Sequence, residues 1–215
     1  MDLLRDSLDW LWAALAALLQ MCGFLVILAG IRRSSVRPNP FSWLIWSMVA
    51  SLAAASSWRA GATWPLAGAG ANALGCIAVL LATLGRGGLS ANRVDLGCLC
   101  AALAGIVAWY WTSDPVVGLT LFLAADAVGA VPTIRTASLD PGSESALGWA
   151  LLALAGIAAV LSVEALHWRW SWSGFGLWGG AVYVAAVNAL VTGVVLFARA
   201  TPTGATGKVR ANVLV

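Results

Sequence analysis

Seven long apolar stretches follow one another along the chain, and the short segments between them hold most of its charged residues. Because about 20 mostly apolar residues cross the hydrocarbon core of a bilayer, stretches of this kind predict membrane spans. We number them as spans one to seven in the order 10–31, 40–58, 64–85, 96–111, 115–136, 145–163 and 175–198. Span four is the shortest.

The composition agrees with this prediction, since 61% of the 215 residues are hydrophobic, only 10% are charged and the mean hydropathy is +0.89. A soluble domain is far less apolar. Backbone polar groups find no water in lipid, and the alternating pattern of a membrane β-barrel is absent, so the spans are predicted to be helices. The predicted fold class is an all-α integral membrane protein with seven transmembrane helices.

An internal repeat relates the two ends of the chain, because residues 31–46 return as residues 134–149 without a gap. Each copy runs from the end of one span through a proline-containing loop into the next span. Repetition of this kind indicates one supersecondary unit that was built twice. The identical pairs are Ile31/Ile134, Arg32/Arg135, Ser35/Ser138, Pro38/Pro141, Ser42/Ser145, Leu44/Leu147 and Trp46/Trp149.

Two three-span units that start on the same side of a membrane need an odd number of spans between them, so span four is predicted to be a linker. The third spans also correspond, since Asn72-Ala73-Leu74 matches Asn188-Ala189-Leu190. We therefore expect a 3+1+3 arrangement of two parallel units. Its parts are a first triple-helix unit (1–86), an inner loop with the linker helix (87–112), a second triple-helix unit (113–199) and a cytoplasmic tail (200–215).

Basic residues divide unequally between the two sides of a seven-span chain. They gather on the cytoplasmic side of membrane proteins, which predicts a multi-pass protein of the cell membrane with its N-terminus outside and its C-terminus in the cytoplasm. Because the charge follows this pattern, we expect contact with lipid and none with nucleic acid. The larger set is Arg32, Arg33, Arg37, Arg86, Arg93, Arg135, Arg199, Lys208 and Arg210, and the smaller set is Arg5, Arg59 and Arg169.

Few strongly polar residues lie within the spans, and these are the candidate site residues. Asp126 in span five is costly at the centre of a bilayer, by about 2.5–3.5 kcal/mol, so it is expected to face a cavity or a hydrogen-bonding partner. Pro132 is expected to kink the same span. Asn72 and Asn188 lie in the middle of matching spans, where they either bind a solute or join helices through hydrogen bonds.

The two triple-helix units, the single linker and the paired asparagines resemble the SWEET sugar transporters and the wider PQ-loop superfamily. Pro132-Thr133-Ile134-Arg135, followed by Ser145, looks like the loop signature of that superfamily, with Thr133 in place of its usual Gln. The resemblance implies that Asn72 and Asn188 line a central substrate site and that an aromatic residue, here Trp58, flanks it. It also implies a hinge at Pro132.

The loop prolines Pro38 and Pro141 are grouped with Pro132 as hinge or gate candidates. Asp126 resembles the acidic residue of PQ-loop relatives that couple transport to protons, so it is a candidate for substrate binding and for proton coupling. The alternative is a structural hydrogen bond from Asp126 to a neighbouring helix. Trp43, Trp46 and Trp149 lie near the predicted inner membrane surface, where an aromatic belt is the expected role.

The sequence thus predicts a transporter of a small polar, sugar-like solute that works by alternating access. The alternatives are a proton-coupled carrier of an amino acid or vitamin and a non-transporting receptor similar to the KDEL receptor. No enzyme constellation, metal site or cofactor site is expected, because the spans contain no histidine cluster and no nucleophile with a base. A homo-oligomer remains open.

Overall fold

The computed structural model describes residues 2–59, 64–86, 91–111, 115–162 and 172–201. In these residues the chain forms seven α-helices and no strand, so the predicted all-α fold class is confirmed. The helices are α1 (Asp2–Arg32), α2 (Pro40–Arg59), α3 (Trp64–Leu84), α4 (Arg93–Trp111), α5 (Pro115–Leu139), α6 (Ala146–Ser162) and α7 (Trp172–Ala200).

The two copies of the repeat end their first helices differently. In the first copy α1 ends at Arg32, and Ser34 follows in a left-handed conformation with φ 56°. In the second copy α5 continues to Leu139 and is closed by the Asp140 N–H, which donates to the Thr136 carbonyl at 2.8 Å. The second loop is therefore shorter than its counterpart, although the two sequences align without a gap.

Two helices in the described part of the chain contain segments long and apolar enough to cross a membrane, Trp10–Arg32 and Gly179–Ala200. Three further apolar segments are shorter, namely Pro40–Ala55, Gly68–Leu84 and Ala146–Ser162. The structure is thus compatible with a membrane protein. Passage of all seven helices through a bilayer stays a prediction.

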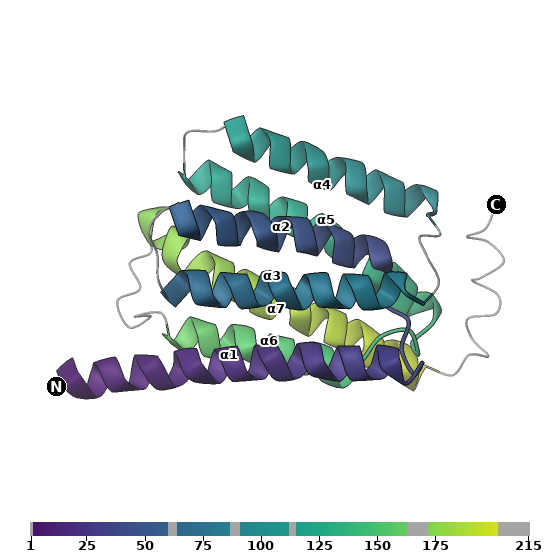
Figure 1. Cartoon of the computed structure of the whole chain (residues 1–215), viewed down its shortest axis with the longest axis horizontal. Helices are drawn as coiled ribbons and strands as arrows, with labels where there is room; N and C mark the ends of the chain where they lie inside the picture. Colours follow the sequence, from purple (N-terminus) through teal and green to yellow (C-terminus); the bar gives the residue numbers. More distant parts are fainter. Residues whose placement is uncertain (1, 60–63, 87–90, 112–114, 163–171, 202–215) are drawn as a thin grey trace.

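Successive helices run in opposite directions, and together the helices form one bundle (Figure 1). In the first half α3 packs against both α1 and α2, and in the second half α7 packs against both α5 and α6. The halves meet where α1 packs on α6 and where α2 packs on α5, while α4 lies mainly against α5.

Glycines allow some of these helices to approach closely. A Cβ atom on Gly148 of α6 would lie 2.5 Å from Ile27 Cγ1 of α1. A Cβ atom on Gly156 would lie 2.6 Å from the backbone nitrogen of Ala185 in α7. Small residues of this kind are the usual means by which helix backbones come together without water between them. They bring α6 close to α1 of the first half and to α7 of its own half.

One end of the bundle carries the loop that joins α1 to α2 and the loop that joins α5 to α6, and we call it the basic end (Figure 1). Arg59, at the last residue of α2, lies at the opposite end. Arg169, Lys208, Arg210 and most of the predicted tail lie outside the described residues. The residues that lie at the basic end are Arg32, Arg33, Arg37, Arg86, Arg93, Arg135 and Arg199.

Candidate functional site

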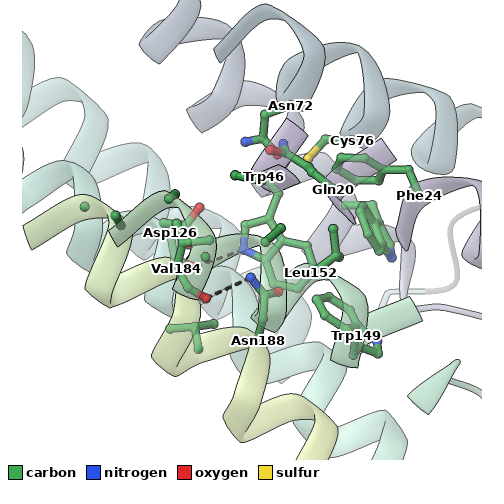
Figure 2. Close-up of a pocket in the computed structure, with 18 residues that line it drawn as sticks. Gln20, Phe24, Trp46, Asn72, Cys76, Asp126, Trp149, Leu152, Val184 and Asn188 are labelled. Carbon is green, nitrogen blue, oxygen red and sulfur yellow. Dashed lines mark hydrogen bonds between the residues drawn. The ribbon is translucent and has the colours of Figure 1, made fainter. Parts of the chain in front are cut away.

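A cavity of about 270 Å³ lies inside the bundle and is lined by residues from every described helix except α4. Its polar lining comes mainly from Gln20, Asn72, Asp126 and Asn188. Three of these are site residues predicted from the sequence, and the structure brings them to one cavity although they lie on α3, α5 and α7. Figure 2 shows Asn72 and Gln20 on one side of it and Asn188 on the opposite side.

The amides of the cavity are held in place by hydrogen bonds. Gln20 Nε2 donates to Asn72 Oδ1 at 2.9 Å, which joins α1 to α3. Asn188 Nδ2 donates to the Val184 carbonyl of its own helix at 2.8 Å. A primary amide has two N–H donors and a carbonyl acceptor, so each asparagine keeps hydrogen-bonding capacity beyond these contacts. The cavity therefore presents oriented, uncharged polar groups.

Asp126 is the acidic residue in the lining of this cavity. Its Oδ2 accepts a hydrogen bond from the Tyr183 hydroxyl at 2.8 Å, and its backbone carbonyl accepts one from Trp46 Nε1 at 3.1 Å. The first bond joins α5 to α7 and the second joins α5 to α2. No Lys, Arg or His side chain lines the cavity among the described residues. The carboxyl group is thus held by neutral donors and has no cationic partner there.

Three tryptophans close the cavity toward the basic end. Trp43 and Trp149 stack with ring centroids 5.6 Å apart, and Trp46 meets them edge-on at 5.2 Å and 5.4 Å. Trp43 and Trp149 are each the fourth residue of a helix that begins at the basic end. We call Trp43, Trp46 and Trp149 the tryptophan floor.

The floor corrects one expectation from the sequence. Trp43, Trp46 and Trp149 are only 1%, 7% and 2% exposed, so they lie inside the bundle, and their assignment to an interfacial aromatic belt is wrong. Toward the other end of the cavity the lining contains small residues, including Ala16, Ala159 and Gly180. The cavity is therefore blocked by large rings at one end and bounded by small side chains at the other.

The remaining predicted site residues lie elsewhere. Trp58 is 73% exposed on α2 and does not line the cavity, so the structure does not bring it to the asparagines. Pro132 is buried within α5, and the N–H of the next residue, Thr133, donates to Ser42 Oγ at 3.0 Å. Pro38 and Pro141 lie in the two loops of the basic end.

Those two loops contact each other directly. The Arg37 N–H donates to the Ser143 carbonyl at 2.8 Å. Arg199 of α7 donates two hydrogen bonds to the second loop, from Nε to the Pro141 carbonyl at 3.1 Å and from Nη2 to the Glu144 carbonyl at 2.7 Å. We call the contact between residues 37–39 and residues 143–144 the loop junction.

Glu144 is fully buried at this junction. Its Oε2 accepts a hydrogen bond from Trp149 Nε1 at 2.9 Å, while Oε1 has no hydrogen-bond partner among the described residues. Burial raises the pKa of Glu144 from 4.5 to about 8, although the hydrogen bonds from Trp149 and from the Asn39 backbone oppose the rise. A buried acid therefore holds one ring of the tryptophan floor, Trp149, by a hydrogen bond on the side of the basic end.

Sequence reasoning did not assign Gln20, Tyr183 or Glu144 to a site. Gln20 could have been found, since it is the strongly polar residue of the first span. Tyr183 contacts Asp126 from another helix, and nothing in the sequence pairs these two residues. Glu144 lies in a loop, where an acidic residue is ordinarily solvated, so its burial depends on the packing of the two halves.

The described residues contain no group of three or more His, Cys, Asp or Glu side chains that could hold a metal ion. The cavity instead combines neutral amides, one acid and aromatic rings, which suits reversible binding of a small molecule.

Comparison of the chain with protein-family models, with curated proteins and with solved structures found no match.

Proposed function

We propose that the protein is an integral membrane transporter that carries a small polar solute through its central cavity by alternating access. The single observation that carries this proposal is the convergence of Asn72, Asn188 and Asp126 on one cavity between the halves of an internally repeated bundle. Binding sites at the interface of two repeats are typical of secondary transporters.

The helix contacts support two parallel triple-helix units with α4 as the linker. The sequence repeat relates α1 to α5 and α2 to α6, so the contact of α1 with α6 and the contact of α5 with α2 are equivalent under exchange of the halves. A pseudo-two-fold axis along the bundle would produce this pattern. The third helices, α3 and α7, then lie across the cavity from each other, where Asn72 and Asn188 face it.

The surface and charge of the bundle support its insertion in a cell membrane. Large apolar side chains point outward, for example Leu18, Leu81 and Phe197, which are 61%, 62% and 75% exposed. Lipid would cover such residues, whereas a soluble protein rarely exposes so many. The arginines of the basic end favour a cytoplasmic position for that end, with the N-terminus outside.

The cavity supports a small, mainly uncharged solute. Its volume of about 270 Å³ is at the lower limit of the range, about 300–1,000 Å³, that is usual for drug-sized ligands. The amides of Asn72, Asn188 and Gln20 suit hydroxyl or amide groups, as in a sugar. Asp126 would add proton coupling, as in a carrier of an amino acid or vitamin, because a carboxyl group held by neutral donors can bind and release a proton.

A receptor that binds a ligand without moving it is the second candidate. This candidate has the same support from the expected 3+1+3 arrangement, because that arrangement also resembles the KDEL receptor. We favour transport because a receptor for a charged ligand would present charged residues from both halves, and Asp126 is the charged residue that lines the cavity in the described part of the chain.

Thermal stability of the purified protein, measured against a panel of sugars, amino acids and vitamins, tests the proposal. A solute that binds the native state raises the melting temperature, and the rise grows with the logarithm of its concentration once that concentration exceeds Kd. The rise should disappear in Asn72→Ala and in Asn188→Ala. The matched control is Asn92→Ala, which changes an asparagine of the loop before α4 that does not line the cavity. Binding that survives in both cavity variants would contradict the proposed site.

A further inference from the structure

The loop junction contains a buried acid, Glu144, which lies outside the lining of the central cavity and, like Asp126, makes no ion pair with a described residue. Glu144 is 0% exposed, and its carboxyl group is hydrogen-bonded to the Trp149 indole. Arg199 contacts the same loop, but it donates to the backbone carbonyls of Glu144 and Pro141 instead of to the carboxylate. An ionised carboxylate at this position would be buried without a counter-charge, which is costly.

The other groups around Glu144 do not supply that charge. Arg37 contributes its backbone N–H to Ser143, and Asn39 contributes a backbone N–H to the Glu144 carboxylate. The side-chain amide of Asn39 makes other contacts: Nδ2 donates to Asp95 Oδ1 of α4 and to Thr136 Oγ1 of α5, each at 3.2 Å. Asp95 is therefore the titratable group that faces the junction from α4, and it is an acid as well.

Glu144 also connects the two halves of the bundle. Its own loop belongs to the second half, whereas Asn39 and Arg37 belong to the first. Its indole partner, Trp149, stacks on Trp43 of the first half. Passage of a solute from the cavity to the basic end would require Trp43 and Trp149 to separate. The same movement would part the loops and expose Glu144 to water.

We propose that the Glu144 carboxyl group is a proton-binding site that controls this movement, with the protonated form holding the tryptophan floor closed and proton release favouring its opening. This inference rests on the proposed function, because it gives the transporter an inner gate and places a coupling proton there. It adds a site that is separate from Asp126, which lines the cavity on the other side of the tryptophan floor.

The direction of the pH effect follows from the two environments. In the closed junction the pKa of Glu144 is about 8, and in water it returns toward 4.5. A proton bound more tightly by the closed state stabilises that state. The extra stability is fully present below 4.5 and is lost as the pH rises to about 8, so opening increases by up to about tenfold per pH unit in that window. Above it the effect levels off.

Infrared spectroscopy of the full-length protein tests proton binding without any need for transport. The C=O band of a protonated carboxyl group should titrate with a midpoint near 8 and should be missing in Glu144→Gln. A midpoint near 4.5 would overturn the proposal. If Glu144→Gln does not fold, Trp149→Phe provides the assignment, because loss of the indole hydrogen bond should shift the same band.

Cysteine labelling tests the gate. Cys76 lines the cavity beyond the tryptophan floor, so a protein that retains only this cysteine reports access from the basic end. The labelling rate by a membrane-impermeant thiol reagent added at that end, divided by the rate in the Glu144→Gln version, should rise at least tenfold between pH 5 and pH 8. The division removes the intrinsic pH dependence of the thiol.

The two measurements separate this inference from the proposed function. A titrating band with a constant labelling ratio would leave Glu144 as a proton site without a gate and would overturn the inference. Both effects in a protein that moves no solute would support the proton-controlled opening and would contradict transport.

Discussion

The close approach of α6 and α7 makes a quantitative prediction about stability. In Gly156→Ala the new Cβ atom would lie 2.6 Å from the backbone nitrogen of Ala185 and 2.7 Å from its Cα atom. Backbone atoms cannot rotate away as a side chain can, so the two helices must separate. Overpacking of this kind costs about 1–3 kcal/mol.

Gly193→Ala is the matched control, because no heavy atom lies within 4 Å of the position that its Cβ would occupy. Alanine favours a helix over glycine by about 1 kcal/mol, and this gain applies equally to both variants. The control should therefore be as stable as the wild type or up to about 1 kcal/mol more stable. Gly156→Ala should fall below the control by about 1–3 kcal/mol, which is the steric cost alone.

The measurement is the free energy of unfolding in mixed detergent micelles, obtained from denaturant titrations followed by far-UV circular dichroism. Comparison of the two alanine variants under identical conditions removes the uncertainty of extrapolation. Equal stability of Gly156→Ala and Gly193→Ala would refute the close contact between α6 and α7. Because Gly156 also lines the cavity, that result would change the shape of the proposed site as well.

Three further predictions concern the tryptophan floor, Asp126 and the orientation of the protein in the membrane. Trp149→Phe removes a hydrogen-bond donor to the buried Glu144 and should lower the free energy of unfolding by about 1–3 kcal/mol. The control Trp111→Phe changes a residue that is 78% exposed, so it should change that free energy by less than about 0.5 kcal/mol. Equal losses in the two variants would contradict the burial of the tryptophan floor. Asp126→Asn should abolish solute uptake driven by a pH gradient while solute exchange continues, and unchanged gradient-driven uptake would assign Asp126 a structural role. An impermeant maleimide applied to intact cells should label Trp111→Cys but not Ser138→Cys at the basic end, and the reverse pattern would overturn the predicted orientation.

Local sequence signals predicted the helices well. Pro40 and Pro115 each begin a helix, because proline's missing N–H is tolerated in the first turn. The end of α5 was missed by three residues, since Ala137, Ser138 and Leu139 continue the helix in the second copy of the repeat. The repeat alone gave no reason for that difference.

The candidate site was predictable where symmetry supplied the evidence. Asn72 and Asn188 occupy matching positions in two units, and the structure places both at the cavity. Trp58 had only the family resemblance behind it, and it lies exposed on α2. A tryptophan near a helix end fits a membrane belt and a packed core equally well, so the tryptophan floor could be recognised only from tertiary packing.

Glu144 shows the same limit for a charged residue. Its loop sequence contains Asp140, Gly142 and Ser143, which is typical of a solvated turn. The burial of its carboxyl group arises from contact with the first loop, from a different part of the chain. Sequence periodicity describes single elements, and it carries no information on which loops meet.

Transport itself is tested most directly by entrance counterflow in proteoliposomes. Vesicles that contain the purified protein are loaded with the solute found in the thermal-stability panel and are diluted into a trace of labelled solute. We predict transient accumulation of label that is absent in Asn188→Ala and retained in Asn92→Ala. Binding of the solute without any accumulation of label would contradict alternating access and would favour the receptor.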